Sequence, residues 1–214
     1  INIGKHLENF VFTEETDLPT TNQRETECLE LQIDSYSVKR YFNEFWTSRQ
    51  RQASSLHEIS YRACFKPQLP AFFINLLTDK GDIVYDPFNG RGTTVIEAAL
   101  LGRNIIANDI NPLSKILSKP RLTIPKLPEL EDYLTKIPNH TSFNSKIDLS
   151  MFYHPETLQE LLALRYYLHQ QAASGGENEI DRWLRMAATN RLTGHSKGFF
   201  SVYTMPPNQA ITPA

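Results

Sequence analysis

Two short runs of residues carry the most specific chemical signal in this chain. The first is Asp86-Pro87-Phe88-Asn89-Gly90-Arg91-Gly92-Thr93-Thr94, where two glycines lie between an apolar run and a helical pattern. Glycine lets backbone approach a ligand closely, because a Cβ at either position would fill the ligand's space or forbid the turn. The second run ends at Asp109, where the next apolar stretch stops. We therefore expect one ligand to contact both runs.

Two nucleotide-binding patterns that contain similar glycines fit this sequence poorly. The dinucleotide fingerprint GxGxxG needs a third glycine where Val95 stands, and its first glycine should directly follow the strand. The phosphate-binding P-loop needs Lys-Ser or Lys-Thr at a fixed distance, and no such pair follows Gly92. A structural turn without a ligand remains the plain alternative.

The two aspartates narrow the chemistry of the ligand. Asp86 at a strand tip would repel a phosphate, but it can accept hydrogen bonds from an amino-acid ammonium group or face a sulfonium. Asp109 at the tip of the next strand can accept both hydroxyls of an unphosphorylated ribose. A nucleoside with an amino-acid tail satisfies both aspartates, and S-adenosyl-L-methionine is such a molecule.

These runs resemble the cofactor motifs of the DNA amino-methyltransferases, which methylate cytosine N4 or adenine N6. In that family a D-P-F-x-G-x-G-T-T turn holds the methionine part and a D-I-N-P segment holds the ribose, although Ser or Gly often stands at the position of Arg91. The segment YRACFKPQLP resembles the family segment that packs near the cofactor's carboxylate. The resemblance covers roughly residues 57–113 and implies S-adenosyl-L-methionine binding by Phe65, Lys66, Pro67, Asp86, Pro87, Phe88, Asn89, Gly90, Gly92, Thr93, Asp109, Ile110 and Asn111.

The same resemblance implies an α/β fold, a partial Rossmann-like S-adenosylmethionine-dependent methyltransferase fold with a helical insertion. It also implies double-stranded DNA as the partner and a role in DNA methylation, as in restriction–modification. The family's catalytic motif is Ser, Asp or Asn followed by Pro-Pro and an aromatic residue, which frees the amine's lone pair and stacks on the flipped base. The chain's Pro-Pro pair lies in Met205-Pro206-Pro207-Asn208, which we interpret as a surface turn.

The catalytic residues therefore remain unassigned, and we expect their motif beyond Ala214. The chain starts at Ile1 rather than Met, so we expect it to be the cofactor-binding half of a longer enzyme, inactive alone. Two other functions stay open. One is an RNA methyltransferase of the tRNA guanosine type, which an added RNA-binding domain would favour. The other is an inactive fragment that binds cofactor or nucleic acid.

Elements that could position these residues can be predicted from hydrophobic periodicity. Buried strands are expected at 82–86 and 104–109, adjacent and parallel in one sheet, with a helix from 93 that stops at Gly102. Further helices are expected at Val38–Arg49, at 67–78, from Pro155 and around Ile180–Ala188, with a strand at 199–204. We predict three regions: an N-terminal arm and helix (1–56), an α/β cofactor core (57–119), and a Pro-rich linker with a helical, basic target-recognition region (120–214).

Composition bounds the class of protein. The chain has 214 residues, with 22 Lys+Arg against 24 Asp+Glu. Its 40% of hydrophobic residues is enough for a packed core. Its two cysteines are too few for a disulfide framework. No zinc spacing, signal peptide or membrane-length apolar run is present, so we expect a soluble, cytoplasmic protein without a metal. The C-terminal stretch is basic, and Arg182, Arg185, Arg191, His195 and Lys197 are candidate nucleic-acid contacts, although on charge alone an ordinary solvated surface is the simpler explanation.

Overall fold

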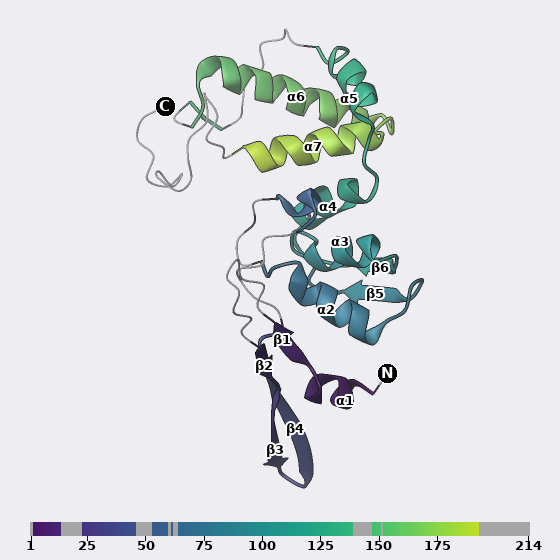
Figure 1. The fold of residues 1–214 in the computed structure, drawn as a ribbon. Coiled ribbons are helices and arrows are strands. Elements are labelled where there is room, and N and C mark those ends of the chain that lie inside the picture. The colour runs from purple at the N-terminus through teal and green to yellow at the C-terminus, as the bar shows by residue number, and fades with distance from the viewer. Residues whose placement is uncertain are drawn as a thin grey trace. The chain divides into compact units, whose positions relative to one another are not determined.

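The computed structural model describes residues 2–13, 23–45, 53–59, 61, 64–138, 147–150 and 152–192. The chain divides into two compact units, residues 1–111 and 112–214, and each is considered by itself. Figure 1 gives the order of the elements along the chain. Three features predicted from sequence lie outside the described residues: the strand at 199–204, the candidate contacts His195 and Lys197, and the turn at 205–208.

The predicted strand–helix–strand unit forms the centre of the first unit. Strand β5 (Ile83–Asp86) pairs with β6 (Asn104–Ala107) in parallel, with Ile83 opposite Asn104 and Asp86 opposite Ala107. Helix α3 (Thr93–Leu100) connects them and packs against both strands, and α2 (Gln68–Leu77) packs on α3. The prediction of adjacent parallel strands at these residues is confirmed.

One face of this strand pair is covered and the other is open. Helix α3 buries Val95, Ile96 and Ala98 almost completely. On the opposite face Ile83 and Tyr85 are exposed, as is Ile106 in β6. The expectation of fully buried strands is therefore wrong: apolar side chains point to both faces, but among the described residues only one face is covered.

The N-terminal segment is more structured than an exposed arm. It contains helix α1 (Ile3–Glu8), the short antiparallel pair β1 (Val11–Thr13) and β2 (Gln23–Glu25), and a longer antiparallel hairpin of β3 (Glu27–Ile33) and β4 (Tyr36–Phe42). The helix predicted from Val38 is wrong over residues 38–42, which are extended. Helical spacing among Tyr41, Phe42 and Phe45 was misleading, because residues 27–42 as a whole alternate with a period of two.

Aromatic side chains join this segment to α2. Phe10 and Phe45 lie with their ring centroids 5.0 Å apart, and both rings contact Phe72 of α2 at 5.7 and 5.4 Å. Phe72 in turn meets Phe73 edge to face at 5.3 Å. Helix α2 begins and ends as predicted, but its stripe is only partly buried, since Phe73 and Leu77 stay exposed. A short helical turn, η1 (Ser55–His57), lies against α3.

The second unit is helical. It contains α4 (Leu113–Ser118), η2 (Lys119–Leu122), α5 (Leu127–Leu134), α6 (Pro155–Ala173) and α7 (Glu179–Arg191). Pro155 takes the first helical turn of α6, as predicted. In the region expected to be a Pro-rich linker, Pro120 and Pro128 lie in the first turns of η2 and α5, because proline is tolerated in a first helical turn.

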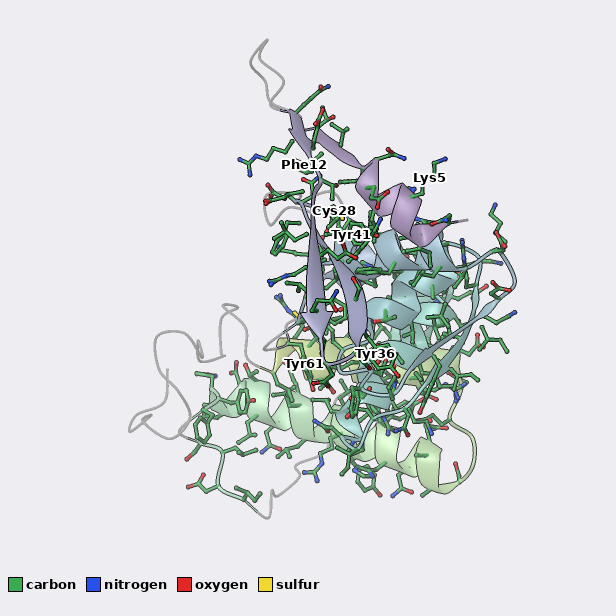
Figure 2. All side chains as sticks on the ribbon, turned by 90° about the horizontal axis from the view of Figure 1, so that it is seen from below. Lys5, Phe12, Cys28, Tyr36, Tyr41 and Tyr61 are labelled. Atoms are coloured by element: carbon green, nitrogen blue, oxygen red, sulfur yellow. The ribbon has the colours of Figure 1, made fainter. Side chains whose placement is uncertain are left out.

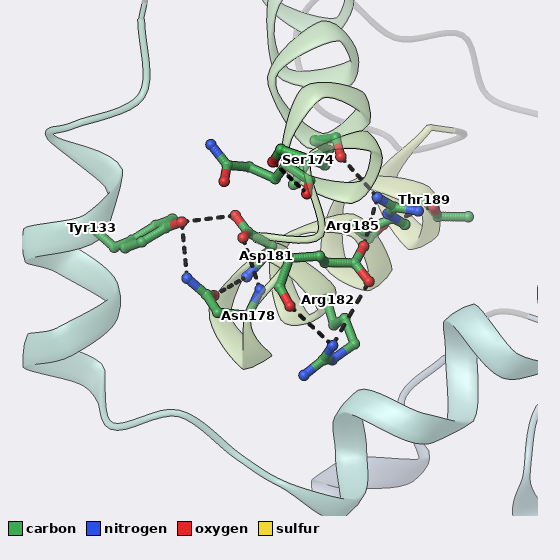
Figure 3. Close-up of polar contacts among 10 residues, drawn as sticks. Tyr133, Ser174, Asn178, Asp181, Arg182, Arg185 and Thr189 are labelled. Atoms are coloured by element: carbon green, nitrogen blue, oxygen red, sulfur yellow. Dashed lines mark hydrogen bonds and ion pairs between the residues drawn. The ribbon is translucent and has the colours of Figure 1, made fainter.

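A buried carboxylate joins three helices of this unit. Asp181 is completely buried, and Asn178 and Asp181 form a reciprocal capping box at the start of α7. The Tyr133 hydroxyl of α5 donates to Asp181 Oδ1 at 3.0 Å (Figure 3). It also accepts from the Tyr167 hydroxyl of α6 at 2.8 Å. This network fixes α5 and α6 at the N-terminus of α7.

Candidate functional site

Backbone hydrogen bonds continue past the ends of β5 and β6 and hold the two strand tips together. The N–H of Asn108 donates to the Asp86 carbonyl at 2.9 Å, and the N–H of Asn89 donates to the Asn108 carbonyl at 3.0 Å. The turn after β5 therefore lies beside the segment after β6. This is the carboxyl edge of the parallel pair, where ligands bind in open α/β sheets.

Two glycines give the turn its path. Gly90 has φ of 53° and Gly92 has φ of 90°, conformations in which a Cβ is strained. A Cβ on Gly90 would also lie 3.6 Å from the ring of Tyr61, a neighbour that sequence reasoning did not identify. Gly92 forms the N-cap of α3, so the backbone turns directly from the strand tip into the helix. The turn itself therefore requires both glycines.

Asp109 is held by the same turn. Its Oδ2 accepts from the Gly90 N–H at 2.7 Å, and its Oδ1 accepts from the Asn111 N–H at 2.8 Å. The bonds from Asn111 and Gly90 hold the pKa of Asp109 below its ordinary value. Each carboxylate oxygen keeps a second lone pair, so the ionised group can accept two further hydrogen bonds.

Two apolar side chains beside these groups are open to solvent. Phe88 is 86% exposed in the turn, and Ile110, directly after Asp109, is fully exposed. The Asp109 carboxylate can accept hydrogen bonds from hydroxyl groups. Phe88 and Ile110 provide apolar surface beside it, against which a planar or aliphatic group of a ligand could pack.

The remaining residues of the turn stabilise its shape. Asp86 Oδ1 accepts from the Phe88 N–H at 3.0 Å, which leaves its second oxygen for another donor. Asn89 and Thr93 are buried, and Pro87 accepts weakly from the Asn108 side chain through its carbonyl. The structure thus brings together the predicted residues from Asp86 to Thr93 with Asp109 and Asn111.

Arg91 points back into the protein. Its Nη1 donates to the carbonyls of His57 and Ile59 at 3.3 and 2.9 Å, and its Nε donates to Thr93 Oγ1 at 3.1 Å. Sequence reasoning noted its unusual charge but could not assign this contact, which depends on a segment far away in sequence. Arg91 ties residues 57–59 to the glycine turn.

His57 is the last residue of the η1 turn. The residue is buried, and its Nε2 lies 2.6 Å from Glu97 Oε1 in α3. The η1 turn therefore packs on α3 through a buried histidine–carboxylate contact. Arg91 and this contact together hold His57 and Ile59 beside the glycine turn and α3.

Phe65, Lys66 and Pro67 precede α2. Pro67 is its N-cap and is buried, whereas Phe65 and Lys66 are exposed. Their role at the cofactor remains a prediction.

The candidate nucleic-acid residues in the second unit lie on α7. Arg185 Nη2 pairs with Glu177 Oε1 at 2.7 Å and donates to the Leu168 carbonyl at 3.1 Å, while Arg182 lies 3.7 Å from Glu177 (Figure 3). Both guanidinium groups thus already have internal partners. Arg191 is exposed at the end of the helix, and His195 and Lys197 lie outside the described residues.

Two classes of site do not appear in the described part of the chain. No cluster of His, Cys, Asp and Glu residues there could bind a metal ion. None of the helices described is long and apolar enough to cross a membrane.

Comparison with known proteins gives consistent matches. A DNA methylase family profile matches residues 8–117. M.MjaII, a type II methyltransferase of Methanocaldococcus jannaschii, is 32% identical over 100 residues, and M.MthZI of Methanothermobacter thermautotrophicus is 31% identical over 107. A tRNA (guanine(10)-N2)-dimethyltransferase of M. jannaschii is 40% identical over 63 residues. No solved structure gives a significant match.

These alignments are partial. They cover 46%, 49% and 29% of this chain, and 19%, 30% and 18% of the three relatives respectively. The family profile, in contrast, takes in more than half of the chain, including both strand tips and the glycine turn between them. The chain therefore belongs to the DNA amino-methyltransferase family.

Proposed function

We propose that this chain supplies the S-adenosyl-L-methionine-binding half of an enzyme that methylates an exocyclic amino group of a DNA base, cytosine N4 or adenine N6. The observation that supports this most directly is Asp109, whose ionised carboxylate is held beside the Gly90–Gly92 turn with lone pairs left for two donors. Vicinal ribose hydroxyls are such a pair of donors.

The residues present fit this cofactor. Asp109 would hold the ribose, exposed Ile110 would pack on the adenine, and the Gly90–Gly92 backbone leaves room for the methionine part. Asp86 would accept from the ammonium group through the oxygen that Phe88 does not use. When bound, the cofactor supplies an electrophilic methyl group; the protein's contribution here is to bind and orient it.

The open face of the β5–β6 pair supports a Rossmann-like fold for the whole enzyme. A doubly wound sheet carries helices on both faces, so exposed Ile83, Tyr85 and Ile106 are the surface on which further elements would pack. The catalytic polar-Pro-Pro-aromatic motif would come from the same additional part. On this proposal the protein is soluble and cytoplasmic, and α7 with the basic stretch after it contacts the phosphates of double-stranded DNA.

A second candidate is methylation of RNA. The observation that favours it is the match to a tRNA (guanine(10)-N2)-dimethyltransferase, in which 40% of 63 aligned residues are identical. The DNA substrate is preferred because the family profile is that of DNA methylases.

The test is transfer of a tritiated methyl group by the intact protein to duplex DNA and, in parallel, to tRNA. We expect the label in DNA, on N4-methylcytosine or N6-methyladenine after hydrolysis to nucleosides. Label in tRNA alone would favour the second candidate. Transfer to neither, despite cofactor binding, would indicate a binding fragment without catalysis.

A further inference from the structure

Residues 55–59 pack against the glycine turn from a distant part of the sequence. Ile59 and Arg91 are 32 residues apart, yet they are joined by a hydrogen bond. Both His57 and Ile59 are buried, and the η1 turn that starts the segment packs on α3. The segment is therefore part of the packed interior of the first unit, and its place there depends on the groups that hold it.

One guanidinium connects this segment to the turn. The Nη1 atom of Arg91 donates to the carbonyls of His57 and Ile59 at 3.3 and 2.9 Å. Its Nε donates at 3.1 Å to Oγ1 of Thr93, the first residue of α3. A guanidinium is planar and its donors point in fixed directions, so one side chain can hold several acceptors in one arrangement. Bonds from an ionised donor are also stronger than those between neutral groups.

A second link joins the same segment to α3. His57 Nε2 lies 2.6 Å from Glu97 Oε1, and the two side chains are only 5% and 12% exposed. Glu97 follows Thr93 by four residues in α3, so both acceptors lie on one face of the helix. Residues 57–59 are thus held along this face at two points, one turn of the helix apart.

The held segment leads to Tyr61, whose ring lies beside Gly90. A Cβ on Gly90 would lie 3.6 Å from Cε1 of Tyr61, which is ordinary van der Waals contact. The Gly90 N–H donates to Asp109 Oδ2 at 2.7 Å. The ring of Tyr61 and the carboxylate of Asp109 therefore adjoin the same glycine. Tyr61, labelled in Figure 2, is half-buried.

We propose that Arg91 is a positioning residue, which holds residues 57–59 so that Tyr61 forms one wall of the cofactor site at Gly90. This role depends on the proposed S-adenosyl-L-methionine site. An aromatic ring there supplies apolar surface for the methylene groups of the methionine part, and aromatic rings attract cations such as a sulfonium. Arg91 itself does not touch the cofactor; its charge is used within the protein.

A cation between two glycines could instead bind the cofactor's carboxylate directly. The contacts of Arg91 favour the positioning role, because Nη1 and Nε already donate to acceptors of the protein. Turning the side chain toward a ligand would break the bond to the carbonyl of Ile59, a buried residue. Loss of a hydrogen bond in a buried place costs more than the bond contributes when formed.

Isothermal titration of the intact protein with S-adenosyl-L-methionine tests this role in a double-mutant cycle of Arg91→Gln and Tyr61→Leu. We expect each single variant to lower the affinity about tenfold, because each removes the same aromatic wall. If Arg91 acts through Tyr61, the double variant should also lose about tenfold, whereas independent contacts with the cofactor would give about a hundredfold. Arg91→Lys, which cannot reproduce the planar fork, replaces Arg91→Gln if circular dichroism shows that the latter is unfolded.

Arg103 provides a matched control at the opposite end of β6. Its guanidinium also holds two backbone carbonyls and one threonine hydroxyl, those of Leu101 and Thr78. Arg103→Gln should therefore lower the melting temperature as Arg91→Gln does, but leave cofactor affinity unchanged.

Three results overturn the positioning role: a hundredfold loss in the double variant, unchanged affinity of Tyr61→Leu, or an equal loss of affinity in Arg103→Gln. Asp109→Ala, titrated alongside, separates this role from the proposed function. If Asp109→Ala loses affinity and Tyr61→Leu does not, only the role of Arg91 is wrong. A parent protein that does not bind the cofactor overturns both.

Discussion

Asp109 illustrates how much of this site depends on single residues. Its carboxylate is held by two backbone N–H groups, from Gly90 before it and Asn111 after it, so its position is set without any ligand. The aspartates at the strand tips could be predicted from sequence because strand ends and glycine turns are local signals. Tyr61 and the contact of Arg91 with His57 could not, because those contacts join segments distant in sequence.

The lowered pKa of Asp109 predicts how cofactor binding depends on pH. The folded-state pKa lies below the ordinary 3.8, so the stabilisation from the ionised group is complete above that value and is lost as the pH falls through the folded pKa. Because Asp109 stays ionised from about pH 5 to 8, its titration should not change cofactor affinity in that range. We expect the affinity to fall only below about pH 4, where the carboxylate becomes protonated. Calorimetric titration across this range checks it; a midpoint near neutral pH would assign the dependence to another group.

At the scale of elements, most helices and the parallel strands could be predicted from the sequence, but the burial of their faces could not. The helices α2, α3, α6 and α7 and the parallel strands follow from apolar periodicity and from turn residues such as Pro155 and Gly102. The β3–β4 hairpin was missed because the aromatic cluster at its end suggested a helix. The alternation of Leu29, Leu31 and Ile33 was the signal that could have found it. Whether a strand face is exposed depends on the other segments that pack on it. The residues of the strand alone therefore do not predict its exposure.

The Asp181 network makes a prediction about the helical unit. Asp181→Ala removes acceptors from the Tyr133 hydroxyl and the Asn178 N–H in a buried position, so the free energy of unfolding should fall by about 2–4 kcal/mol. Chemical denaturation measures this, with Asp132→Ala, on an exposed face, as the control that should change it by less than about 0.5 kcal/mol.

The hydroxyl of Tyr133 offers an independent readout of the same network. Burial and the hydrogen bonds with Tyr167 and Asp181 raise the pKa of Tyr133 above its ordinary range. In an ultraviolet titration Tyr133 should therefore remain protonated while exposed tyrosines ionise, and Asp181→Ala should lower its pKa. If Asp181→Ala has the same free energy of unfolding as the parent, the network does not stabilise the helical unit.

At the scale of the whole molecule, the chain combines a proposed cofactor-binding unit with a helical unit in which no acidic residue follows Asp181. If α7 and the basic residues after it contact DNA phosphates, log affinity falls with log salt at a slope of about −0.9 per contact. We expect Arg191→Gln to reduce the magnitude of that slope by about one without changing cofactor affinity. Arg185→Gln should also lower the melting temperature, because it removes the ion pair with Glu177. If Arg191→Gln leaves the slope unchanged, Arg191 does not contact a DNA phosphate.

The most direct test of the account is cofactor binding by Asp109 variants of the intact protein. Isothermal titration with S-adenosyl-L-methionine should show that Asp109→Ala lowers affinity at least about tenfold, because two charge-assisted hydrogen bonds are lost. Asp79→Ala removes the same charge from an exposed position in the same unit and should leave affinity unchanged. Equal affinities for the parent and Asp109→Ala would contradict the placement of the cofactor at these strand tips.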